Sequence, residues 1–358
     1  MVNDNCNLHS NSLTIYHQNI CGLKGKTDEL SMSPNLPQIL CFSEHHLKHT
    51  EFEQINTEGF KLCTAYCRQA TKRGGVRIFI QKGLEYSKID VHKYCKDQDI
   101  EICVLNLKTT TFSSHIMVVY STPTGNCNLF LNRLDETIKS IDTANLNLIL
   151  CGDINIDYFT ENDRKRQLDS LLQTCNLTGI VTFPTRSQGT CSTMIDNIFI
   201  DNSKIPNYTV SPFFNGMSDH DTQLLIVKDI NLQSQGHYVY VTRSMNNYSI
   251  NEFKISLSYE TWVCVFGLNN NPDVDTLFNS FLNNYLGIFH NHFPLRKFIK
   301  RDNHTSWITP GIKISCKHKR FLYLCTRSSD DISLKKYYKQ YCKTLEQTIN
   351  NALNSLSK

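Results

Sequence analysis

The alternation of apolar and polar residues predicts a series of short strands along the first two thirds of the chain. The residues of Leu13–Gln18 alternate with the period of a half-buried strand, and short apolar runs of strand length recur after it. The predicted strands cover residues 13–18, 39–43, 76–80, 102–107, 115–120, 148–151, 195–200 and 224–227. Apolar residues at helical spacing predict helices at residues 128–143 and 164–175. Many short strands with few helices favour an α/β domain of two packed sheets with helices outside.

The pattern changes after residue 228. Residues 229–248 are polar, and Gln233-Ser234-Gln235-Gly236 within them is typical of a linker. Ser249 and Glu252 have the capping-box spacing that starts a helix, and helical stripes follow at residues 272–289 and 334–353. We therefore predict a disordered start at residues 1–12, a domain at 13–228, a linker at 229–248 and a mostly helical, basic extension at 249–358.

Charge is distributed unevenly along the chain. Residues 291–358 contain 14 Lys and Arg against 4 Asp and Glu, whereas residues 1–290 contain 23 against 29. A mildly acidic body is thus followed by a strongly basic tail. Such a tail is either a solvated helix face or a contact surface for a polyanion such as nucleic acid.

Cysteine usage and hydropathy indicate an intracellular protein without a membrane segment. None of the 15 cysteines forms a Cys-x-x-Cys pair, so a zinc ribbon or a redox motif is unsupported. The polar start lacks the apolar core of a signal peptide. No apolar run approaches the roughly 18–20 residues that a membrane span requires.

Polar residues that can take part in catalysis follow the predicted strands or the loops beside them. They are Asn19, Glu44, Tyr120, Asp153, Asn155, Asp196 and the run Ser218-Asp219-His220. Each alone has a structural explanation, since Asp and Asn commonly start turns where strands end. Seven such groups in this order are hard to explain by chance, and we predict that they line one cleft.

The residue types in this set suit hydrolysis of a phosphodiester. Mg²⁺ prefers oxygen ligands and needs only one or two carboxylates, so Glu44 is the best ligand candidate, followed by Asn19 and Asp219. The attacking water must lose its proton to a positioned base. Asp153 suits this role, with Asn155 orienting the water or the scissile phosphate.

Charge that builds on the phosphoryl oxygens in the transition state needs preplaced hydrogen-bond donors. His220 can supply one, and Asp196 is a candidate for the acid that holds its second ring nitrogen. Tyr120 offers a phenol to the phosphate or to the leaving oxygen. These groups together predict a metal-dependent phosphodiesterase.

Several motifs carry a resemblance to a known family. They are Gln18-Asn19-Ile20-Cys21-Gly22-Leu23, Ser43-Glu44, Arg73-Gly74-Gly75-Val76, Tyr120-Ser121-Thr122-Pro123, Gly152-Asp153-Ile154-Asn155, Ile195-Asp196-Asn197-Ile198-Phe199 and Ser218-Asp219-His220. Over about residues 13–227 the chain resembles the endonuclease/exonuclease/phosphatase superfamily. Within that superfamily it is most similar to the apurinic-like endonuclease domain of LINE-type (non-LTR) retrotransposon polyproteins.

This resemblance implies a four-layer, DNase I-like α/β sandwich and a divalent metal, Mg²⁺ with Mn²⁺ as the alternative. It implies nuclear action, nicking one DNA strand to leave a 3′-hydroxyl that primes reverse transcription, with element RNA as a second partner through the basic tail. The residues that it implies for the site are Asn19, Glu44, Tyr120, Asp153, Asn155, Asp196, Asp219 and His220. Residues 307–323 are similar to the connector that precedes reverse transcriptase, so we expect a fragment ending before the polymerase.

Two other functions remain open at this point. The predicted first helix, between Asp28 and Ile39, is short and contains two prolines, which favours a catalytically decayed nucleic-acid-binding remnant. A phospholipid or inositol phosphate hydrolase of the same superfamily is the second alternative. Arg186 and Lys72-Arg73 are either phosphate contacts or ordinary surface charges.

Overall fold

The computed structural model describes residues 11–31, 36–51, 57, 59–69, 71, 73–109, 112–141, 147–188, 191–232, 239–243, 245–267, 272–299, 308–327 and 329–356. It divides the chain into two compact units, one formed by Met1–Gln235 with His304–Lys358 and the other by Gly236–Asn303. Most of the predicted disordered start, the predicted phosphate contact Lys72 and the linker motif at residues 233–236 lie outside the described residues.

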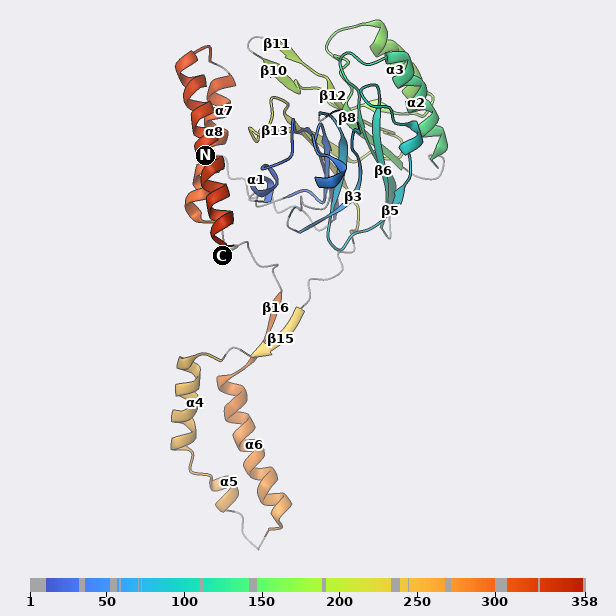
Figure 1. The fold of residues 1–358 in the computed structure, drawn as a ribbon. Helices are drawn as coiled ribbons and strands as arrows, with labels where there is room; N and C mark the ends of the chain where they lie inside the picture. Colours follow the sequence, from blue (N-terminus) through green and yellow to red (C-terminus); the bar gives the residue numbers. More distant parts are fainter. Residues whose placement is uncertain are drawn as a thin grey trace. The chain divides into compact units, whose positions relative to one another are not determined.

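Two mixed six-stranded sheets form the core of the larger unit (Figure 1). The first sheet has the order β13-β14-β1-β2-β4-β3, and the second has the order β5-β6-β7-β8-β12-β9. In the first sheet the strands are β1 (Ser12–Asn19), β2 (Ile39–Ser43), β3 (Phe60–Tyr66), β4 (Val76–Gln81), β13 (Tyr208–Phe213) and β14 (Thr222–Lys228). In the second they are β5 (Glu85–Ile89), β6 (Glu101–Lys108), β7 (Ser113–Tyr120), β8 (Asn147–Asp153), β9 (Thr178–Gly179) and β12 (Asp196–Ile200).

Apolar side chains of both sheets pack against one another and form the central core. Ile15 and Ile39 of the first sheet share this cluster with Val118 and Ile149 of the second. Helices α2 (Cys127–Ser140) and α3 (Asp163–Gln173) cover the outer face of the second sheet, and the short α1 (Thr27–Ser31) lies on that of the first. Two sheets with helices on their outer faces confirm the predicted four-layer α/β sandwich.

Four strands of the two large sheets escaped prediction, and each is an edge strand. They are β3, β5, β9 and β13. β13 alternates between half-buried and exposed residues and contains a proline, Pro212. Edge strands tolerate proline and bury one face incompletely, so their apolar pattern is weak. The larger unit also contains a small hairpin of β10 (Arg186–Gln188) and β11 (Cys191–Thr193), and 3₁₀ turns at His49–Glu51 and His92–Tyr94.

The smaller unit contains α4 (Asn247–Tyr259), α5 (Val263–Phe266), α6 (Val274–His292) and a two-stranded sheet of β15 (Val239–Arg243) and β16 (Leu295–Ile299). α4 and α6 pack through Phe253, whose ring lies 5.8 Å from those of Tyr285 and Phe289. The predicted capping box at Ser249 was wrong in register. Asn246 caps α4 and Ser249 is its third residue, because the Asn246 side chain reaches the Ser249 N–H.

The helical extension includes a hairpin within the larger unit, formed by α7 (Pro310–Arg327) and α8 (Ile332–Leu356). The two helices pack through Ile312, Cys316, Leu345 and Ile349. Among the described helices, none has the length and apolar composition to cross a bilayer.

Gly152 on β8 is packed too closely to accept a side chain. A Cβ built there would lie 2.0 Å from the carbonyl oxygen of Val119 on the paired strand β7. We expect Gly152→Ala to lower the free energy of unfolding by about 3 kcal/mol or more, because the backbone of β7 or β8 would have to shift to make room for the methyl group. Gly311→Ala on α7 is the matched control, since its Cβ would meet only the Thr309 hydroxyl at 3.8 Å. Urea denaturation of both variants tests this, and equal stabilities would contradict it.

Candidate active site

The central core ends in polar residues at one edge of the sandwich. Successive strand residues alternate faces, so the rows of side chains that fill the space between the sheets can be followed to their ends. The row Ile149, Cys151 on β8 ends in Asp153, and the row Ile116, Val118 on β7 ends in Tyr120. In the same way, Asn19 ends the inner row of β1 and Asp196 begins that of β12.

Strand pairing sets these residues side by side. Asp153 lies opposite Tyr120 in the parallel pair of β7 and β8, and opposite Asp196 in the antiparallel pair of β8 and β12. Asn19 lies opposite Ser43, the residue before Glu44. The ladder hydrogen bonds of both sheets therefore determine the positions of four predicted site residues.

One side-chain amide joins the two sheets at this edge. Asn19 Nδ2 donates to Glu44 Oε1 at 2.8 Å and to Asp153 Oδ2 at 2.7 Å. The backbone N–H of Asn155 donates to the other oxygen of Asp153 at 3.1 Å. The Asn155 side-chain amide itself donates to the Ser121 carbonyl at 2.6 Å, so in this structure it holds the loop that follows β8.

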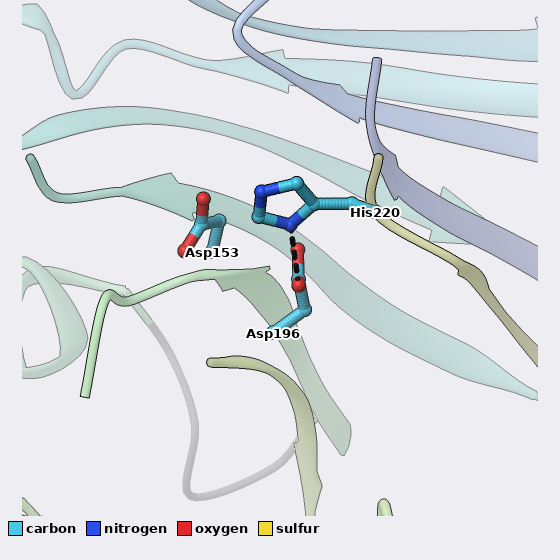
Figure 2. A group of neighbouring side chains, drawn as sticks. All are labelled: Asp153, Asp196 and His220. Atoms are coloured by element: carbon cyan, nitrogen blue, oxygen red, sulfur yellow. Dashed lines mark hydrogen bonds and ion pairs between the residues drawn. The ribbon is translucent and has the colours of Figure 1, made fainter. Parts of the chain in front are cut away.

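A buried imidazole–carboxylate pair lies next to Asp153 (Figure 2). His220 Nδ1 is 2.8 Å from Asp196 Oδ2, and both side chains are nearly inaccessible to solvent. The Asp196 N–H donates to the Thr185 hydroxyl, and the carbonyl of His220 accepts from the Gln18 amide at 2.8 Å. Both members of the pair are therefore anchored by further hydrogen bonds.

The carboxylates and the imidazole shift one another's pKa. Burial, assisted by the negative charge of Asp196, raises the pKa of Asp153 to about 8. Burial alone would lower the pKa of His220, but Asp196, with help from Asp153 and Asp219, raises it to about 9. Burial opposes ionisation of Glu44 as well, yet hydrogen bonds from His46, Asn19 and Tyr120 lower its pKa to about 2. The edge thus combines an ionised Glu44 with a protonated His220 at neutral pH.

Left-handed backbone conformations gather around these side chains. Cys21, Glu44, His46 and Asn155 have φ of +46°, +52°, +57° and +50°. Such φ values are uncommon for residues other than glycine. They persist where the surrounding structure holds the backbone in place, and they are often found at active sites.

Asp219, predicted as a metal ligand, lies on the exposed side of this group. Arg186 Nη2 is 2.8 Å from Asp219 Oδ2, and the Asp219 side chain is half exposed. Arg186, predicted as a phosphate contact, is therefore paired with an acid. Arg73 is exposed.

Sequence reasoning missed three residues that support the site. His46 Nε2 is 3.0 Å from Glu44 Oε2 and fixes that carboxylate. Arg68 and Glu101 form a buried ion pair, and the Arg68 guanidinium lies 5.7 Å from the ring centre of Tyr120. His46 could have been noticed from its place two residues after Glu44. The Arg68–Glu101 pair has no local signal, because 33 residues separate its members.

The group of acids is suited to a divalent cation. One potential ligand atom from each of Asp153, Asp196 and His220 lies within 4.8 Å of the others. Asp196 Oδ1 is buried and, among the described residues, has no hydrogen-bond partner. Glu44 and Asp153 also lie close enough together for both carboxylates to accept from the same nitrogen, Asn19 Nδ2. A cation at this edge would relieve the repulsion between carboxylates that raises the pKa of Asp153.

A cavity of about 630 Å³ begins beside Glu44. It is lined by Cys21, Gly22, Lys24, Lys26, His45, His46, Leu47, Lys48, Thr50 and Glu51. Three lysines and one glutamate give its wall a positive charge, which suits a phosphate group.

Comparison with known proteins agrees with this geometry. Residues 114–235 match the family model described as endonuclease-reverse transcriptase. None of the curated proteins compared matches the chain. The endonuclease domain of TRAS1, a telomere-specific non-LTR retrotransposon, is 15% identical with a TM-score of 0.51, over 61% of this chain and 99% of that one.

Two further solved structures align with a similar share of the chain. The 3′-5′ exonuclease NExo from Neisseria meningitidis is 16% identical, with a TM-score of 0.48 over 60% of this chain and 100% of that one. An AP endonuclease from Archaeoglobus fulgidus is also 16% identical, with a TM-score of 0.47 over 61% and 100%. The likeness to the TRAS1 domain shows the fold, and with the family match it confirms the resemblance predicted from the motifs.

Proposed function

We propose, on the premise that the chain carries an endonuclease/exonuclease/phosphatase domain of the endonuclease-reverse transcriptase family, that it is a Mg²⁺-dependent DNA endonuclease. It hydrolyses one phosphodiester of target DNA, and the nick primes reverse transcription of the element's RNA. One observation carries the proposal: Asp153 lies between an amide-linked Glu44 and the Asp196–His220 pair. Cleavage of chromosomal DNA would place the protein in the nucleus.

Glu44 and Asn19 would hold the metal, with Asp219 as a third candidate once Arg186 releases it. Mg²⁺, or Mn²⁺ in its place, would supply a Lewis acid that neutralises charge on the scissile phosphate. The Asn19 amide would have to turn its oxygen toward the cation, since its nitrogen now faces Glu44 and Asp153.

The side chains then divide the chemistry between them. An Asp153 oxygen takes a proton from water while the water oxygen bonds to phosphorus, and the bond from phosphorus to the 3′-oxygen breaks. His220 Nε2–H donates to a phosphoryl oxygen, because Nδ1–H is held by Asp196. The Tyr120 hydroxyl donates a hydrogen bond to the phosphate or to the leaving 3′-oxygen, and that oxygen takes up its proton from solvent water. The products are a 3′-hydroxyl and a 5′-phosphate.

Two features support nucleic acid as the substrate. The lysine-lined cavity beside Glu44 offers a place for a neighbouring backbone phosphate. The basic residues of the C-terminal region would add contacts to DNA or to element RNA. The basic C-terminal region favours a polymeric substrate over a small inositol phosphate, because only a polymer could reach both the site and further basic residues.

The end left at the nick tests this proposal. Plasmid nicked in Mg²⁺ should be extended directly by a DNA polymerase, which requires a 3′-hydroxyl. Nicks that need phosphatase treatment before extension would contradict the mechanism. Phosphate release from inositol phosphates without DNA cleavage would replace it with the hydrolase. Salt-sensitive, metal-independent DNA binding without cleavage would favour a decayed remnant.

Mg²⁺ is expected to stabilise the folded protein through Glu44. At a free concentration about ten times Kd, binding adds about 1.4 kcal/mol to the free energy of unfolding, because only the folded state offers the site. This corresponds to a rise in Tm of about 2–4 °C, measured by calorimetry against EDTA. The rise should disappear in Glu44→Gln and persist in Glu51→Gln, a control at another glutamate that lines the cavity. Equal rises in both variants would rule out Glu44 as a ligand.

A further inference from the structure

The α7–α8 hairpin contacts the loop that carries His220. A Cβ built on Gly216 would lie 3.1 Å from the nearest side-chain atom of Tyr323, and the Tyr338 hydroxyl donates to the Gly216 carbonyl at 3.4 Å. Both tyrosines come from the hairpin, more than 100 residues further along the chain. The loop at residues 214–221 is thus covered by a segment outside the predicted nuclease domain.

Arg327, the last residue of α7, makes three contacts with the body from one guanidinium. Its Nη1 is 2.6 Å from Asp221 Oδ2, and its Nη2 donates to the Ser187 hydroxyl at 2.6 Å. Its Cζ lies 5.3 Å from the ring centre of Phe214. The planar fork of arginine suits such simultaneous contacts better than an ammonium group.

The Arg327–Asp221 pair is mostly shielded from water. The Asp221 side chain is 2% exposed and that of Arg327 is 21% exposed. Burial raises the pKa of Asp221 to about 6 although Arg327 opposes this shift. A buried carboxylate without its partner is strongly unfavourable, so the loop depends on Arg327 to keep Asp221 in place.

Asp221 is linked to both members of the Asp196–His220 pair, to His220 through the chain and to Asp196 through Thr185. It follows His220 in the chain, and its N–H donates to the Thr185 carbonyl at 2.7 Å. The hydroxyl of Thr185 accepts the N–H of Asp196 at 3.1 Å. Arg327 therefore connects Ser187 with Asp221. Asp221 follows His220 in the chain, and Ser187 lies two residues after Thr185, which contacts Asp196.

We propose that Arg327 is a positioning residue for His220, so that the α7–α8 hairpin is part of the nuclease rather than a connector. This inference rests on the proposed function, because it assigns Arg327 a role in the same reaction. Arg327 itself touches neither substrate nor metal. It holds the loop that aims the His220 imidazole at the scissile phosphate.

The test compares Arg327→Ala with Lys319→Ala in the full chain. Lys319 is the matched control, because it joins the same hairpin to the body through a buried ion pair with Glu29, at 2.6 Å. Arg327→Ala is expected to reduce kcat for plasmid nicking about 10- to 100-fold with little change in KM. The reason is that His220 would be slightly misplaced relative to the scissile phosphate, while the residues that bind DNA would stay in place. Lys319→Ala should retain wild-type kcat. Arg327→Lys should recover only part of the loss, because an ammonium group can pair with Asp221 but cannot also make the contacts to Ser187 and Phe214. Equal losses of kcat in Arg327→Ala and Lys319→Ala would overturn the proposal.

A second readout does not depend on cleavage. The strongly hydrogen-bonded Nδ1 proton of His220 should give a far-downfield NMR resonance in the wild type and in Lys319→Ala. It should weaken or vanish in Arg327→Ala, or in Arg327→Gln if the alanine variant does not fold. An unchanged resonance in the Arg327 variants would overturn the positioning role even if the protein cleaves no DNA. A wild type that cleaves no DNA but shows the resonance, with loss of the resonance in the Arg327 variants, would fault only the proposed function.

Discussion

Replacement of Asp153 by alanine is expected to reduce the rate of DNA nicking by about 10³-fold or more. General-base catalysis alone contributes roughly 10²–10⁴-fold. The substitution also removes the acceptor that holds Asn19 between the two sheets, so the predicted metal site loses a contact as well. The initial rate of plasmid nicking at saturating Mg²⁺ measures the effect.

The control for this variant is Asp135→Ala. Asp135 lies on the exposed face of α2, where it pairs with Lys139, and its loss should leave the rate unchanged. Circular dichroism should show that both variants are folded. A loss of less than about tenfold in Asp153→Ala would be too small for a general base and would remove Asp153 from that role.

Replacement of Asp196 by asparagine is expected to move the alkaline limb of the pH–rate profile to lower pH. His220 must be protonated to donate to the phosphate, and its pKa of about 9 predicts that the wild-type rate falls above that pH. Asp196 is the largest influence that raises this pKa, while burial lowers it. Without the carboxylate, burial meets less opposition, so the pKa of the imidazole falls and the proton is lost at lower pH. At pH 8 we expect a loss of about 10²-fold, the scale of one transition-state donor.

The direction of this shift separates two roles for His220. A protonated donor loses activity as pH rises, whereas a general base gains it. Profiles of the wild type and Asp196→Asn between pH 6 and 10 therefore decide the matter. An alkaline limb that stays at the same pH in Asp196→Asn would show that it does not belong to His220.

The sequence predicted the central strands well because both of their faces are buried. β1, β2, β8 and β12 have continuous or alternating apolar residues, and the polar residue at the end of each interrupts a clear pattern. This is why Asn19, Asp153 and Asp196 could be singled out before their neighbours were known. Their grouping followed from the general rule that strand ends meet at a sheet edge.

The supporting contacts could not be predicted because they join residues far apart in the chain. Arg327 and Asp221 are more than 100 residues apart, and Arg186 reaches Asp219 over 33. No periodicity or motif connects the two members of either pair. The partner of a long side chain is determined by tertiary packing, and a single sequence contains no direct information about that packing.

The short first helix turns out to have little bearing on the site. Among the described residues α1 covers Thr27–Ser31, and Asn19 contacts both Glu44 and Asp153. These residues are placed by the pairing of β1 with β2 and by the packing of the two sheets. The decay hypothesis, which rested on that helix, therefore loses its structural reason.

The most direct test of the account is the nicking of supercoiled plasmid by the purified full chain, with wild type and Asp153→Ala compared side by side. In Mg²⁺ the wild type should convert supercoiled to open-circular DNA, and EDTA should abolish the conversion. Asp153→Ala should leave the plasmid supercoiled over the same period. Equal conversion by both proteins, or conversion that persists in EDTA, would contradict a metal-dependent nuclease that uses Asp153.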